Sequence, residues 1–214
     1  FPFTTLPEQA EGLRWLADIR QMASSPTVAA LHRELREVTP ETYKLDFLAF
    51  GGEQAAPSET ELTNFEDPDE LTVCRRYFQS GFNDVRIGKD ATIESWKGKT
   101  STARYIHIAD MPPAMGGGFQ LADGTLSLDE VRNTPLHAEM VVITARTTHD
   151  QQLHRARAFL DAGARWVLLA GWEVHDRTRV QYIGNIYDSM NQERPPVRAM
   201  SEGRNRLFGD ALTG

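Results

Sequence analysis

Cysteine is almost absent from the 214 residues: Cys74 is the only one, so the chain cannot form an internal disulfide. This composition agrees with a reducing compartment. The sequence also lacks any apolar run near the about 18 to 20 residues of a membrane-spanning helix, and it begins without a charged segment followed by an apolar one. We therefore expect a soluble protein of the cytoplasm that has no membrane partner.

An excess of basic residues is missing as well. Lys and Arg number 23 against 30 for Asp and Glu, which gives a net charge of −7. Phosphate backbones repel a chain with this balance, so we expect no nucleic-acid partner. Hydrophobic residues make up 40% of the sequence, and its length suits one domain, or one domain with an appendage.

Helical and strand patterns divide the chain near residue 40. Residues 7–22 and 26–38 carry apolar side chains at helical spacing, which predicts an N-terminal helical segment over 1–40. Beyond it, short apolar runs alternate with helical patterns. We predict strands at 44–50, 84–87, 104–109, 119–122, 140–145 and 166–170, and helices at 68–79, 92–97, 126–132, 150–162, 177–191 and 196–208. This alternation indicates an α/β fold, and the nearly continuous apolar runs favour a mostly parallel sheet covered on both faces.

Seven segments of the second part carry a resemblance to a known family. They read FLAFGGE (47–53), GKDAT (88–92), YIHIAD (105–110), FQLADGTLSLDEV (119–131), VVITA (141–145), AFLDAGARWVLLAGWEVHD (158–176) and RAMSEGRNRLF (198–208). In this order they resemble the CHAT domain, a bacterial branch of the caspase-like cysteine peptidases. The run 158–176 is the most specific, because it joins a helix, an AGA turn, a buried strand and a Trp followed two residues later by Val.

The resemblance implies a caspase-like fold for residues 41–214, a three-layer α/β/α sandwich. CHAT domains commonly accompany helical-repeat regions. The 1–40 segment is then interpreted as the end of such a region or as a docking element, and the chain as part of a larger protein or complex.

Both catalytic positions of the family differ in this sequence. Members place a His at the end of one strand, in a pattern like H-x-A-x-H-G, and a Cys at the end of the next, in a pattern like S-A-C. Here these positions hold Met111 and Arg146. Methionine has no proton to exchange, and a guanidinium stays protonated and offers no lone pair to a carbonyl. The resemblance therefore implies a degenerate dyad, no catalytic residue and no cofactor.

A candidate binding rim surrounds these two positions. In open parallel sheets, ligands lie at the carboxyl ends of the strands. The residues that we expect there are Asp110, Met111, Arg146, Thr147, Thr148, Trp172 and Glu173. Arg146 could bind an anion or a partner's carboxylate, or it could form a structural salt bridge with Asp110.

We predict a pseudo-peptidase that acts as a protein-interaction, scaffolding or regulatory module. Two alternatives stay open: an active peptidase with Cys74 as a displaced nucleophile, and a sensor of small anions at Arg146. His107 is interpreted as a hydrogen-bonded core or rim residue on the same strand face as Ala109 and Met111. Asp150 and His154 have helical spacing for a metal, but no third ligand accompanies them, so we predict no metal.

Overall fold

A computed structural model describes residues 43–52, 70–78, 81–109, 111–144, 148–169 and 176–213. The predicted helices at 7–22 and 26–38 lie outside these residues. The division of the chain at residue 40 therefore stays a prediction.

A five-stranded parallel sheet with the strand order β2-β1-β3-β6-β7 forms the centre of the structure. Its strands are β1 (Leu45–Gly51), β2 (Asn83–Ile87), β3 (Ala103–Ala109), β6 (Met140–Ile143) and β7 (Trp166–Leu169). A separate antiparallel hairpin consists of β4 (Phe119–Leu121) and β5 (Gly124–Leu126). Parallel neighbours require crossover connections, and helices supply most of these here.

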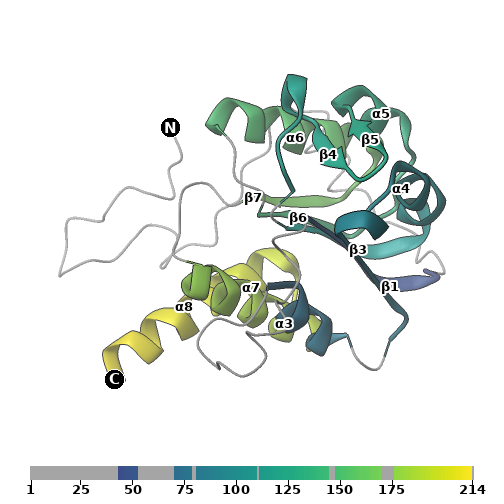
Figure 1. Cartoon of the computed structure of the whole chain (residues 1–214). Coiled ribbons are helices and arrows are strands. Elements are labelled where there is room, and N and C mark those ends of the chain that lie inside the picture. The colour runs from purple at the N-terminus through teal and green to yellow at the C-terminus, as the bar shows by residue number, and fades with distance from the viewer. Residues whose placement is uncertain are drawn as a thin grey trace.

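Helices cover both faces of the sheet (Figure 1). One face carries α4 (Ile93–Lys99), α5 (Leu128–Asn133) and α6 (His149–Ala162), together with the hairpin, and the other carries α3 (Glu70–Tyr77), α7 (Asp176–Asn191) and α8 (Pro196–Thr213). This is the predicted three-layer α/β/α sandwich. None of the described helices is long and apolar enough to cross a bilayer.

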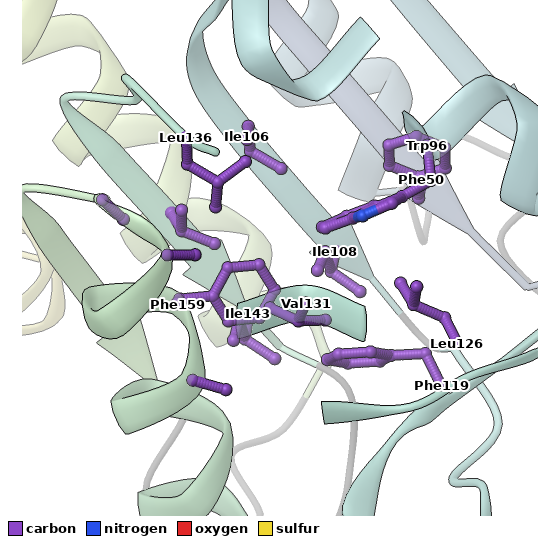
Figure 2. Close-up of a cluster of buried hydrophobic side chains, with 14 of the residues drawn as sticks. Phe50, Trp96, Ile106, Ile108, Phe119, Leu126, Val131, Leu136, Ile143 and Phe159 are labelled. Carbon is purple, nitrogen blue, oxygen red and sulfur yellow. The ribbon is translucent and has the colours of Figure 1, made fainter. Parts of the chain in front are cut away.

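Each face of the sheet has its own hydrophobic core. Under α4, α5 and α6, the ring of Trp96 meets that of Phe159 edge-on at 5.8 Å between centroids, next to Ile108 and Ile143 from the sheet (Figure 2). On the opposite face, Phe47 and Phe78 stack at 4.6 Å. Burial of this apolar area is the main force that holds the layers together.

Local sequence signals explain several helix ends. Thr92 and Ser127 each accept a hydrogen bond from the backbone N–H three residues on, and each forms a capping box that starts α4 or α5. Gly163 ends α6 in the left-handed conformation, with φ at 118°.

Two expectations about strands were wrong in detail. The sequence predicted a strand at 119–122 followed by a helix at 126–132, but Gly124–Leu126 forms β5 and pairs with β4, and the helix begins at Leu128. A three-residue strand is too short to show the alternation on which strand prediction depends. The predicted strand 140–145 ends at Ile143, although the Thr144 N–H still donates to the Ile108 carbonyl at 2.9 Å, and residue 145 lies outside the described residues.

Candidate functional site

The two strands that precede the family's catalytic positions are neighbours. β3 and β6 run parallel, with Ile108 beside Ile143, so the residues that follow them leave the sheet at the same edge. This carboxyl edge is where parallel α/β sheets bind ligands. The arrangement of strands that the candidate site requires is therefore present.

Met111 lies just beyond β3 and is buried, with 3% of its surface exposed. Its side chain belongs to the core under α4, α5 and α6, whereas His107 and Ala109 lie on the opposite face. The prediction that Met111 shares a face with His107 was wrong, because β3 ends at Ala109 and strand alternation does not continue past it. A buried thioether at this position packs like a core residue.

Most of the predicted rim lies outside the described residues. This applies to Asp110, Arg146, Thr147, Trp172 and Glu173, so their roles and the Asp110–Arg146 salt bridge stay predictions. Thr148 is described: it is exposed, and its hydroxyl accepts a hydrogen bond from the Gln151 N–H at 3.4 Å as the N-cap of α6. This contact gives Thr148 a structural role at the rim.

Behind the carboxyl edge, a buried carboxylate joins three elements. Glu70, the first residue of α3, accepts hydrogen bonds from His107 Nε2 on β3 at 2.9 Å and from Arg179 Nε on α7 at 3.0 Å. All three side chains are buried. Burial works to raise the pKa of Glu70, but hydrogen bonds with His107 and Thr144 and the charge of Arg179 outweigh it and lower that pKa. Glu70 is therefore ionised at neutral pH.

Tyr187 completes this cluster at the second ring nitrogen of His107. The Tyr187 oxygen lies 2.8 Å from His107 Nδ1, and burial raises the pKa of Tyr187 well above 10. Since the Glu70 carboxylate can only accept, His107 Nε2 donates to it, and the Tyr187 hydroxyl is the partner of Nδ1. We call Glu70, His107, Arg179 and Tyr187 the buried polar cluster.

The buried polar cluster has a structural role, because its atoms are not accessible for chemistry on a substrate. His107 and Tyr187 have no exposed surface, so a substrate cannot reach them without a rearrangement. Both ring nitrogens of His107 are occupied, which confirms its interpretation as a bonded core residue. Its partners could not be predicted from local patterns, because Glu70 and Tyr187 lie 37 and 80 positions from His107 along the chain.

Arg155 fixes the turn that follows Met111. From α6, its Nε donates to the Gly117 carbonyl at 2.7 Å and its Nη2 to the Gly118 carbonyl at 2.9 Å, while its guanidinium lies 4.4 Å from the centroid of Phe119. Arg155 is fully buried, and burial lowers its pKa to about 10, so it stays charged at neutral pH. The role of Arg155 was not predicted from the sequence, because it is one of several charged residues in the predicted helix 150–162.

Cys74 is buried and has no contact with solvent. It is on α3, has no exposed surface and packs in the core with Tyr187 and Ile183. No group of three or more metal-ligating side chains occurs in the part of the chain that the structure describes.

Comparison with known protein families matches residues 1–212 to the family described as the CHAT domain. A search of curated proteins gives no match for this chain. The family match agrees with the α/β sandwich with its parallel sheet and with the segments that carried the resemblance.

Proposed function

This chain belongs to the CHAT domain family, and we propose that it is a catalytically inactive member that acts as a protein-interaction, scaffolding or regulatory module. As part of the same proposal, the protein works in the cytoplasm of a bacterium. One cysteine and no disulfide suit a reducing compartment.

The observation that carries the proposal is the burial of the only thiol. A cysteine nucleophile must reach the substrate carbonyl as a thiolate, and exposure and a nearby base promote that state. Cys74 is fully covered, and the two nitrogens of the buried His107 are already hydrogen-bonded to Glu70 and Tyr187. These contacts argue against a peptidase that uses Cys74 as a displaced nucleophile.

The family's own catalytic positions support the same conclusion. The position of the general base holds Met111, which is packed in the core, and the position of the nucleophile holds Arg146. Neither side chain can take over the chemistry that it replaces. We expect the permanent positive charge of Arg146 to suit recognition of an acidic partner rather than peptidase chemistry.

An affinity experiment tests the interaction function. The tagged chain is used to capture proteins from its native cell extract, alongside Arg146→Glu and, as a matched control, Arg157→Glu on the exposed face of α6. We expect a partner that the wild type and the control retain and that Arg146→Glu loses. The same partners on all three proteins would overturn the role of Arg146 as the binding cation.

A further inference from the structure

A pocket opens at the end of the sheet opposite the family's catalytic positions. It has a volume of about 360 Å³ and lies between the turn that enters β6 and the turn that enters β7, with Tyr43 at its border. We call it the amino-edge pocket. Its size is at the lower end of the range for small-ligand sites, which suits a single residue of a bound chain.

The walls of the amino-edge pocket are fixed by backbone hydrogen bonds. The Leu136 N–H donates to the Ala162 carbonyl at 2.8 Å, and the Arg165 N–H donates to the Ala138 carbonyl at 2.9 Å. A side chain at Gly163 would overlap the Leu136 carbonyl oxygen, so the two turns are in close contact. The pocket is therefore preformed, which reduces the entropy lost on binding.

Its lining combines an apolar floor with one unbalanced cation. Leu136, Ala138 and Ala162 are buried and line the floor. Arg165 also lines the pocket, and among the residues that the structure describes no carboxylate pairs with it and its Nε has no hydrogen-bond partner. A covered donor without a partner is rare in native proteins.

The one carboxylate of the lining does not neutralise Arg165. Glu139 accepts hydrogen bonds from Arg104 Nε at 3.0 Å and from the Tyr105 hydroxyl at 3.1 Å, so its charge is balanced by Arg104. The remaining charge of the pocket is the guanidinium of Arg165. This complements an anion, even though the whole chain is acidic.

We propose that the amino-edge pocket binds the C-terminal residue of a partner protein, with an apolar side chain on the floor and the terminal carboxylate at Arg165. A C-terminal residue presents both groups from one Cα atom, which matches a pocket of one-residue size with a single cation. An internal Asp or Glu would instead need a second residue to supply the apolar group. This inference rests on the proposed interaction function and names the chemistry of a partner.

The test measures binding of short peptides to the chain by calorimetry. The probes are N-acetylated pentapeptides of glycine and serine that end in leucine, valine or phenylalanine, each as the free acid and as the amide. We expect at least one acid to bind, and its amide to bind about tenfold or more weakly, because the amide loses the charged hydrogen bonds. If no acid binds more tightly than its amide, the proposal is wrong.

Variants locate the site. Arg165→Gln and Ala162→Leu, which fills the floor, should each weaken the acid peptide about tenfold or more, while Arg157→Gln, on the exposed face of α6, should leave it unchanged. Equal weakening by Arg157→Gln would place the peptide elsewhere. If Arg165→Gln does not fold, Ala162→Leu still tests whether the peptide binds in the amino-edge pocket, and the comparison of acid with amide still tests whether its carboxylate is recognised. Turnover of peptides would overturn the proposed inactivity, whereas absence of binding would overturn only the pocket.

Discussion

At the scale of single residues, the buried polar cluster is the feature whose assembly requires the most desolvation free energy. Glu70 brings a full negative charge into the core, and interactions with His107, Arg179 and Thr144 offset its desolvation. Loss of one member of such a buried pair leaves the other uncompensated. The three elements that meet there, α3, β3 and α7, should therefore depend strongly on Glu70.

Glu70→Gln should lower the free energy of unfolding at neutral pH by about 3 kcal/mol, because it removes the buried carboxylate that faces the Arg179 guanidinium and His107. It should also change the response to acid. The folded-state pKa of Glu70 lies below its ordinary value of 4.5, so its ionisation stabilises the wild type above that pH, and this stabilisation is lost as the pH falls through the lowered pKa. Urea denaturation at several pH values measures both effects.

The matched control is Glu94→Gln, at an exposed position of α4. We expect the control to follow the wild type in acid and the Glu70 variant to lose less stability than either between neutral and acidic pH. An acid dependence that is the same in all three proteins would mean that Glu70 does not contribute through its charge.

At the scale of elements, the structure distinguishes two glycines that the sequence presents alike. Gly163 ends α6 at a φ of 118°, where an added Cβ would also overlap the Leu136 carbonyl oxygen. Gly98 lies inside α4 and has no atom within 4 Å of an added Cβ. A left-handed position in close contact and an open helical position should respond to alanine with opposite signs.

We predict that Gly98→Ala raises the free energy of unfolding by about 0.5 to 1 kcal/mol, since alanine is the better helix former. Gly163→Ala should lower it by more than about 1 kcal/mol, because it strains the C-cap. Thermal or urea denaturation of both variants measures the difference. Destabilisation by Gly98→Ala would contradict the open surroundings of that position.

The turn after β3 depends on the Arg155 guanidinium, which holds two carbonyls at once. Arg155→Lys keeps the charge but loses the planar fork, so it cannot hold the two carbonyls in the same fixed geometry. We expect amide hydrogen exchange at Ala114 and Gly117, which are bonded within this turn, to become about tenfold faster, while Val142 in the sheet is unchanged. An equal increase at Val142 would show that Arg155 supports the whole fold rather than the turn.

At the scale of the whole molecule, the order of strands and helices could be predicted because each depends on local patterns. The strand 104–109, the Ser127 cap and the Gly163 end of α6 all follow from a few neighbouring residues. The buried polar cluster could not be predicted, because Arg179 and Glu70 are 109 positions apart in the sequence and only the folded topology brings them together.

The same limit applies to the candidate site. The family resemblance identified Met111 and Arg146 as the altered catalytic positions, and the sheet brings the ends of their strands to one edge. The sequence could not show the face on which Met111 packs, because the alternation of side chains predicts faces only within a strand and Met111 lies beyond the end of β3. The amino-edge pocket also escaped prediction, since it is formed by two turns that pack together only in the folded chain.

The central claim is that this CHAT domain keeps the family's fold without its peptidase chemistry. The measurement that tests it most directly is turnover of a fluorogenic peptide library by the purified chain, with Cys74→Ala alongside and a thiol-reactive probe applied to the folded protein. We predict no turnover, and labelling of Cys74 only after denaturation, since the thiol has no exposed surface. Turnover that Cys74→Ala abolishes, together with rapid labelling of the folded chain, would contradict the account.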